Sequence, residues 1–160
     1  MKNKELEKFL NDHDIKYGFF EHEPLLTMED SYKYTNHIPG EHCKNLFVTD
    51  KKRVNYYHIL TKGQKAVDLK QLQTAMNATR LSFPSAERLD SVLHLEPGCV
   101  NPLTMIYTDD HVHYYFDEEL LTCDYLIFCP SVVDESINMT VSEFKKFIEA
   151  TGKTVNFIKM

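Results

Sequence analysis

The sequence predicts an α+β fold in which a mixed, partly closed β-barrel-like sheet is ringed by helices. The length of 160 residues suits one domain and is long enough to bury a proper core. The composition, 42% hydrophobic and 26% charged, is that of an ordinary globular chain. About seven short strand patterns and five helical patterns follow one another without strict alternation, which favours a mixed sheet with peripheral helices.

The N-terminal third contains two helical patterns and three strand patterns. Apolar residues at helical spacing predict a helix over 4–13, and a run of aromatic residues predicts a short strand over 16–21. A threonine followed three residues later by an aspartate resembles a capping box and opens a helix over 27–34. Strands over 44–49 and 55–61 are expected to pair as a hairpin across a basic, polar turn.

The middle of the chain begins with two capped helices. An aspartate cap precedes a helix over 68–76, and a serine cap precedes one over 85–93. Apolar runs over 103–107 and 112–116 flank an Asp-Asp pair, and we expect them to form a second hairpin. A helical turn is expected over 118–121.

The C-terminal part alternates apolar strands with one strongly marked helix. Strands are expected over 125–128, 136–139 and 155–158. Between the last two, a full Thr-Val-Ser-Glu capping box opens a helix over 140–152. Its final residue, Gly152, stands where a glycine commonly ends a helix.

Charge is distributed unevenly along the chain. The net charge of −6 argues against broad nucleic-acid binding. Residues 44–80 hold eight basic and two acidic side chains, which gives +6 and leaves −12 for the remainder. Such a basic face could hold a few phosphates, although a solvated surface on which lysines cluster explains it equally well.

Membrane association and disulfides are not expected. No apolar run reaches the length of a transmembrane helix, and the N-terminus lacks the apolar core of a signal peptide, so we expect a cytoplasmic protein. The four cysteines form no C-x-x-C pair and are interpreted as reduced thiols in that compartment.

Two loops carry the chemistry that the residues themselves suggest. Lys44 and Asn45 enter a strand a few residues after a Pro-Gly turn, which brings a cation and a hydrogen-bonding amide to the rim of the sheet. A second loop carries Gly98 and Pro102 in a Gly-x-x-x-Pro spacing, and its backbone N–H groups could converge on an oxyanion. Taken alone, Gly98 and Pro102 are also explained as an ordinary turn, and Lys44 is also explained as a solvated strand end.

Motifs of well-known enzyme classes are absent. No nucleophile elbow, Walker loop or dinucleotide-binding glycine pattern occurs. His111 and His113 would share a strand face, which admits a zinc site, but an exposed polar hairpin is the simpler interpretation. We expect no metal and no cofactor.

Several segments, in order and over nearly the whole chain, resemble the family of prolyl-tRNA editing proteins, the YbaK/prolyl-tRNA-synthetase-associated domain. The likeness is strongest to its free-standing alanyl-tRNA(Pro) deacylases. The Lys-Asn-Leu-Phe, Arg-Leu-Ser-Phe and Pro-Gly-x-Val-x-Pro motifs occur in this order and are together quite specific. The matching segments are 22–30, 39–47, 67–70, 80–89, 97–102 and 147–152.

The resemblance implies one editing domain over 1–160 that hydrolyses the ester of tRNA(Pro) mischarged with alanine. It implies the acceptor end of tRNA(Pro) as the partner and no membrane, and leaves open whether the chain docks on prolyl-tRNA synthetase. The family's essential lysine corresponds to Lys44. The expected catalytic residues are Lys44, Asn45 and Gly98, and the expected substrate-binding residues are His42, Cys99, Val100, Asn101, Pro102 and Cys129.

One departure from the family pattern bears on specificity. Members specific for alanine typically carry Phe-His-Pro late in the chain, where this sequence has Phe-Cys-Pro with Cys129 at the centre. A deacylase for another small aminoacyl-tRNA, such as Cys-tRNA(Pro), is therefore an alternative. A non-catalytic regulator that binds aminoacyl-tRNA or an amino acid is a second alternative. A metal-dependent hydrolase using His111 and His113 is the third and weakest.

Overall fold

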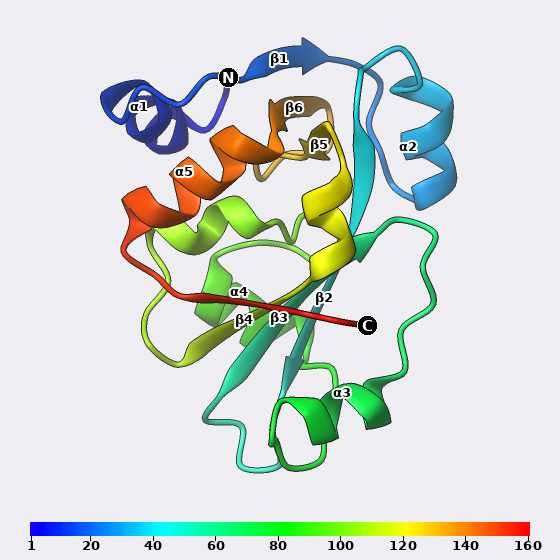
Figure 1. Cartoon of the computed structure of the whole chain (residues 1–160), viewed down its shortest axis with the longest axis vertical. Helices are drawn as coiled ribbons and strands as arrows, with labels where there is room; N and C mark the ends of the chain where they lie inside the picture. Colours follow the sequence, from blue (N-terminus) through cyan, green and yellow to red (C-terminus); the bar gives the residue numbers. More distant parts are fainter.

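A computed structural model describes all residues from 1 to 160, and Figure 1 shows one sheet with helices packed around it. The α-helices are α1 (Lys4–Asp12), α2 (Met28–Tyr34), α3 (Leu69–Ala75), α4 (Ala86–Leu93) and α5 (Val141–Thr151), with short 3-10 helices η1 (Pro102–Ile106) and η2 (Glu118–Thr122). The strands are β1 (Gly18–Glu21), β2 (Glu41–Thr49), β3 (Tyr56–Lys62), β4 (Val112–Asp117), β5 (Tyr125–Phe128), β6 (Glu135–Thr140) and β7 (Val155–Ile158).

The seven strands form one mixed sheet in the order β1-β6-β5-β2-β3-β4-β7. Pairs β1–β6, β5–β6 and β2–β3 are antiparallel, whereas β2–β5, β3–β4 and β4–β7 are parallel. The predicted α+β class with a mixed sheet is therefore confirmed. The two halves of the sheet meet through β2 and β5, which pair only at Glu41 and His42.

The helix starts that the sequence predicts are made by the expected caps. The side chains of Thr27, Ser85 and Thr140 each accept a hydrogen bond from the backbone N–H three residues later. Asp68 caps α3 in the same way, accepting from Lys70 and Gln71. Each cap satisfies a donor that the first turn of a helix otherwise leaves free.

The predicted strand over 103–107, and with it the second hairpin, is wrong. This segment is the 3-10 helix η1, which begins at Pro102 after Asn101, whose side chain accepts from the backbone N–H of Leu103. Periodicity cannot distinguish a short buried helix from a buried strand, and Leu103 and Met105 are both buried. Strand β4 pairs instead with β3 and β7, parallel to both.

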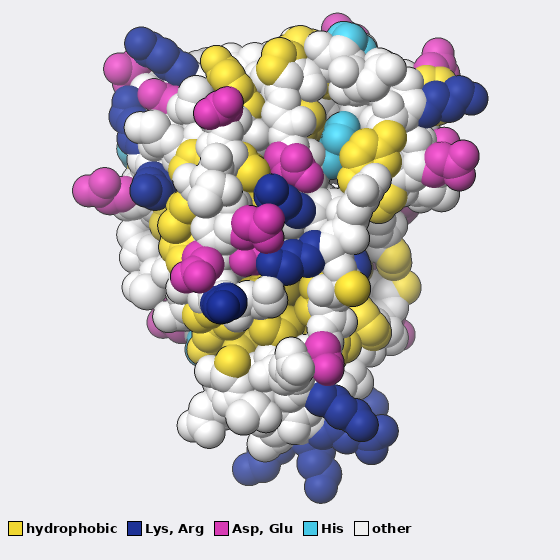
Figure 2. All heavy atoms as spheres, turned by 45° about the vertical axis from the view of Figure 1, so that its right-hand side comes forward, with side chains coloured by type: hydrophobic (Ala, Val, Ile, Leu, Met, Phe, Trp, Pro, Cys, Tyr) yellow, Lys and Arg dark blue, Asp and Glu magenta, His cyan; other side chains and the backbone are white.

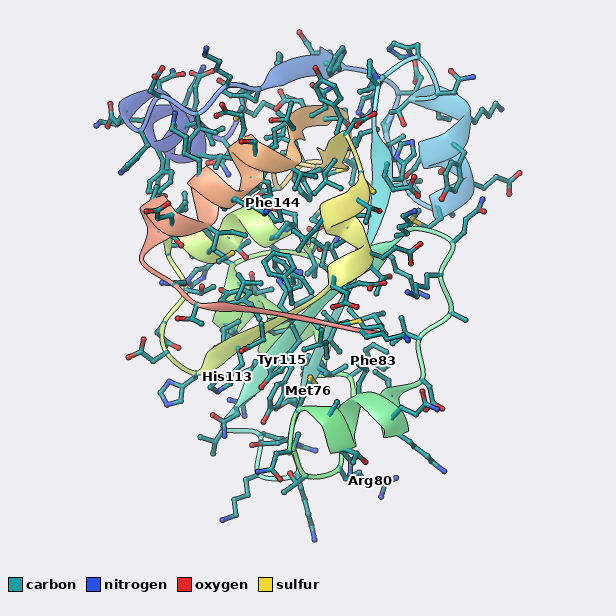
Figure 3. All side chains as sticks on the ribbon, in the orientation of Figure 1. Met76, Arg80, Phe83, His113, Tyr115 and Phe144 are labelled. Atoms are coloured by element: carbon teal, nitrogen blue, oxygen red, sulfur yellow. The ribbon has the colours of Figure 1, made fainter.

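The core lies between α5 and the sheet. Phe144 is fully buried and stacks on Phe116 of β4, with ring centroids 6.0 Å apart. Its ring also meets Phe128 of β5 in a tilted arrangement at 4.9 Å. Figure 3 labels Phe144 between α5 and the strands. A smaller apolar cluster, which includes Tyr57 and Met76, fills the space between β3 and α3. Strand β3 is thus covered on both faces, which explains its apolar sequence.

No helix in the structure has the length and apolar character that a membrane crossing requires.

Candidate functional site

A pocket opens where β2 separates from β5. The carbonyl of His42 accepts from the backbone N–H of Gly63 at 2.8 Å, and the N–H of Asp50 donates to the carbonyl of Asn55 at 3.2 Å. Antiparallel pairing alternates, so the even-numbered residues of β2 bond to β3 and the odd-numbered ones point their N–H and C=O groups the other way. No strand pairs with that side between His42 and the bridge of Thr49 to Ser82.

This pocket has a volume of about 350 Å³ and is mostly apolar. Four segments line it: 25–31 at the start of α2, 42–46 of β2, the loop at Gly98 and Val100, and the end of β5 with Ser136. Figure 1 shows α2 beside the upper part of β2, which forms one wall. Lys44 is the only Lys, Arg, Asp or Glu in the lining. An anionic group entering the pocket therefore meets one cation and no competing carboxylate.

Lys44 is oriented by a backbone carbonyl and not by a counter-charge. Its Nζ donates to the carbonyl oxygen of Lys65 at 3.2 Å, and it forms no ion pair. Lys65 is itself fixed, because its Nζ contacts the buried Asp117 at 2.6 Å and Glu119 at 2.9 Å. The hydrogen bond to Asp117, followed by that to Glu119, raises the pKa of Lys65. The network thus positions Lys44 while leaving its charge available to a ligand.

Asn45 is oriented from below by a buried histidine. The Nε2 of His58 lies 2.8 Å from the Oδ1 of Asn45. Burial lowers the pKa of His58 to about 3, so the ring is neutral at physiological pH and its one N–H belongs on Nε2, facing the Asn45 oxygen. The carboxamide nitrogen of Asn45 remains free to donate to a ligand in the pocket.

His42 is held in a comparable way on the α2 side. The hydroxyl of Thr35 donates to the carbonyl of Ser31, so it can only accept from the Nε2–H of His42, at 3.2 Å. The ring also meets Tyr32 edge-on at 5.0 Å. Burial lowers the pKa of His42, which favours a neutral ring. His42 therefore lines the pocket in a fixed orientation and with a fixed tautomer.

The Gly98 loop brings its backbone to the pocket. Gly98 has φ +93°, a conformation that favours glycine, and a Cβ at this position would meet nothing within 4 Å. Buried Asn101 secures the loop, because its Nδ2 donates to the carbonyl of Cys99 at 2.9 Å and its Oδ1 accepts from Leu103. The backbone at Gly98 is thus accessible from the pocket, and the hydrogen bonds of Asn101 fix the conformation of the loop.

The structure brings six of the nine predicted site residues together around this pocket. The six are His42, Lys44, Asn45, Gly98, Val100 and Cys129. The other three support the loop from outside the lining: Cys99 packs against the core, Asn101 is hydrogen-bonded within the loop, and Pro102 starts η1.

Cys129 lies beside a polar pair that the sequence reasoning missed. Burial raises the pKa of the Cys129 thiol to about 11, although a hydrogen bond with Ser136 opposes this, so the thiol is protonated. The Oγ of Ser136 lies 2.7 Å from the Nε2 of His22, whose Nδ1 donates to the carbonyl of Glu23. The sequence did contain the His22-Glu23-Pro24 turn, but nothing linked it to a serine 114 residues away.

His111 and His113 do not form a shared site. His113 contacts Asn55 at 3.0 Å, whereas His111 precedes β4 and contacts Asp109 at 3.3 Å. No group of three or more His, Cys, Asp or Glu side chains is arranged to hold a metal ion. The structure therefore gives the metal-dependent alternative no support.

Comparison with protein families finds a match over most of the chain. The model of the aminoacyl-tRNA editing domain matches residues 22–147, a span that includes every lining segment of the pocket. Among curated proteins, the prolyl-tRNA editing protein ProX of Acetoanaerobium sticklandii is 28% identical over 152 residues, covering 94% of this chain and 93% of that protein. The prolyl-tRNA synthetase associated domain-containing protein 1 of Mus musculus is 28% identical, with 92% and 90% covered.

Several solved structures share the fold. The crystal structure of the hypothetical protein APE2540 superimposes with a TM-score of 0.75 at 16% identity, covering 95% of this chain and 97% of that one. That of a proposed trans-editing enzyme for prolyl tRNA synthetase gives 0.71 at 17% identity, covering 98% and 96%. At these identities the likeness concerns the fold alone.

Proposed function

This chain belongs to the aminoacyl-tRNA editing domain family, and from that premise we propose that it is a trans-editing deacylase for Ala-tRNA(Pro). We propose further that the whole chain, 1–160, acts as a single editing domain. The observation that carries the proposal is the position of Lys44, the one charged side chain in an otherwise largely apolar pocket. A relative named as a prolyl-tRNA editing protein supports tRNA(Pro) as the substrate.

The proposed reaction is hydrolysis of the ester between the amino acid and the terminal ribose. Lys44 binds the phosphate or ribose of the terminal adenosine, and the amide of Asn45 donates to the same end of the substrate. Water adds to the ester carbonyl carbon, and the backbone at Gly98 stabilises the oxyanion that develops. The carbon–oxygen bond to the ribose then breaks, and the ribose oxygen takes up a proton.

The protonation states in the pocket favour water over a protein nucleophile. Burial raises the pKa of both Cys43 and Cys129, so neither thiol is an effective nucleophile at neutral pH. The lining holds no carboxylate, and His42 already donates its Nε2–H to Thr35. The neighbouring ribose hydroxyl of the tRNA therefore assists the water, and the chain contributes position and charge stabilisation.

Selectivity follows from size in this proposal. A synthetase site built for proline cannot strongly exclude a smaller amino acid, because each missing methylene is worth only about 1–3 kcal/mol. An editing pocket that admits alanine and excludes the proline ring removes the alanine that the synthetase has attached by mistake. Cys129 is smaller than histidine and a weaker donor, which keeps cysteinyl-tRNA(Pro) as the second candidate substrate.

A deacylation panel tests the proposal. Ala-, Cys-, Ser- and Pro-tRNA(Pro) are each incubated with the wild type, with Lys44→Ala and with the control Lys145→Ala, whose lysine is exposed on α5. We expect fast hydrolysis of Ala-tRNA(Pro), none of Pro-tRNA(Pro), and loss of activity only in Lys44→Ala. Full activity in Lys44→Ala would overturn the role of Lys44. Tight binding of all four tRNAs without turnover would instead favour the non-catalytic regulator.

A further inference from the structure

A second hollow lies further along the same open side of β2. It has a volume of about 350 Å³ and is formed by the end of β2, the segment 82–85 and α4. Arg53, from the turn after β2, and Arg88, from α4, both line it, and so does Phe83. We refer to it as the Arg53–Arg88 hollow. None of its lining residues lines the first pocket.

The charges in this hollow are not neutralised by the protein. Arg53 and Arg88 are exposed, and neither takes part in any of the ion pairs of the chain. Glu87 is the one acidic side chain in the lining, which leaves one net positive charge. Two free guanidinium groups suit a phosphate, because each presents a planar fork of donors.

An exposed aromatic ring accompanies these cations. Phe83 is 62% exposed, and it lies in the lining with both arginines. Figure 3 labels it just above α3. A cationic groove with an aromatic side chain on which a base can stack is the usual way to bind single-stranded nucleic acid. The hydroxyls of Ser82 and Ser91 add hydrogen-bonding groups.

The two hollows are spaced for one short strand of RNA. Leu46 lines the first pocket and Thr49 lines the Arg53–Arg88 hollow, so three strand residues, about 10 Å, separate them. Stacked nucleotides rise about 3.4 Å each along a strand, so this gap corresponds to two or three nucleotides. The unpaired backbone groups of Asn45 and Phe47 lie along the side of β2 between the two hollows.

We propose that the Arg53–Arg88 hollow binds the single-stranded 3′ end of the RNA, two or three nucleotides before the terminal adenosine. The guanidinium groups hold a backbone phosphate and Phe83 stacks on a base. The inference rests on the proposed function, since it takes the first pocket as the site of that adenosine. Figure 2 shows further Lys and Arg side chains gathered at the lower end of the molecule, where Figure 1 places the β2–β3 turn and α3.

Binding of uncharged RNA tests the inference independently of catalysis. The probe is a fluorescein-labelled acceptor-stem hairpin that ends in single-stranded ACCA, compared by anisotropy with the same hairpin ending bluntly. We expect the wild type to prefer the ACCA hairpin, and Phe83→Leu and Arg88→Gln each to weaken its binding about tenfold. The slope of log K against log salt should fall by about 0.7 in Arg88→Gln, as for one lost single-strand phosphate contact.

Matched controls separate this effect from general losses of charge or apolar surface. Arg80→Gln removes an exposed arginine that lines neither hollow, and Figure 3 places it beyond α3. Phe19→Leu removes an aromatic ring that is 37% exposed, in β1. Both should bind the ACCA hairpin within twofold of the wild type. Equal binding by Phe83→Leu, Arg88→Gln and the wild type would overturn the inference.

Failure of this inference is distinguishable from failure of the proposed function. If the wild type hydrolyses Ala-tRNA(Pro) and the two hollow variants bind as it does, the inference is wrong and the function stands. If the wild type hydrolyses no aminoacyl-tRNA but both variants lose binding, the function is wrong and the RNA-binding hollow stands.

Discussion

The first pocket and the Arg53–Arg88 hollow lie along one strand and have the same volume, about 350 Å³ each, but they are built differently. In the first pocket a second residue holds each polar group: Lys65 holds Lys44, and His58 holds Asn45. In the hollow the two arginines are exposed and form no ion pair.

This difference indicates two kinds of recognition. Groups that must stabilise a transition state are useful only when their geometry is fixed beforehand, because preorganised donors need no rearrangement during the reaction. Groups that hold a flexible phosphate backbone need charge and reach more than exact position. We therefore expect substitutions in the first pocket to act through geometry and substitutions in the hollow to act through charge.

The largest effect should come from exchanging the two kinds of cation. Lys44→Arg keeps the charge, but a planar guanidinium cannot take the place of an ammonium held 3.2 Å from the Lys65 carbonyl, and we expect kcat/KM for Ala-tRNA(Pro) to fall about 100-fold. Arg88→Lys loses the forked donors of the guanidinium but keeps an exposed cation near the phosphate, so we expect a smaller fall in kcat/KM, of about threefold. Equal losses in the two variants would break the distinction between the sites.

Gly98→Ala should cost about tenfold in kcat while leaving the chain folded. The added Cβ meets nothing within 4 Å, so the effect must come from strain at φ +93° and the resulting shift of the loop. Gly152→Ala is the matched control, because Gly152 has φ +72° and similarly open space but ends α5. Both variants should lose about 1 kcal/mol in urea unfolding. Loss of activity in both variants would mean that the effect comes from reduced stability in general and not from a shift of the Gly98 loop.

Lys65→Met should reduce kcat several-fold and destabilise the fold by about 3 kcal/mol. It leaves the buried Asp117 carboxylate without its cation and loosens the carbonyl that orients Lys44. Lys62→Met is the control, because Lys62 pairs only with the half-exposed Glu119, and its unfolding midpoint should barely change. A rise in KM with unchanged kcat in Lys65→Met would argue against a positioning role.

The last prediction concerns acid stability. The pKa of buried His58 is about 3, below its ordinary value of 6.5, so protonation favours the unfolded chain. Its contribution is complete above pH 6.5 and is lost as the pH falls from 6.5 toward 3, by up to about 1.4 kcal/mol per pH unit. His58→Phe should flatten this part of the stability curve in urea titrations, whereas exposed His111→Gln should not. Parallel curves for His58→Phe and wild type would contradict the assignment.

The local signals in the sequence were reliable where one residue decides the structure. The caps at Thr27, Asp68, Ser85 and Thr140 predicted four helix starts, since a cap acts on backbone groups within the next three residues. The prediction for the segment after Pro102 was wrong, because a short apolar run is as compatible with a buried strand as with a 3-10 helix.

The sequence by itself determined the class of fold, the resemblance to the editing family and the two loops that meet at the pocket. It could not reveal which residues orient the side chains of these loops. The contacts of His58 with Asn45, Lys65 with Asp117, and His22 with Ser136 join residues 13, 52 and 114 positions apart. Only tertiary packing brings such residues together. The separation of β2 from β5 creates the opening of the pocket, and the packing around it buries the groups that orient its lining residues.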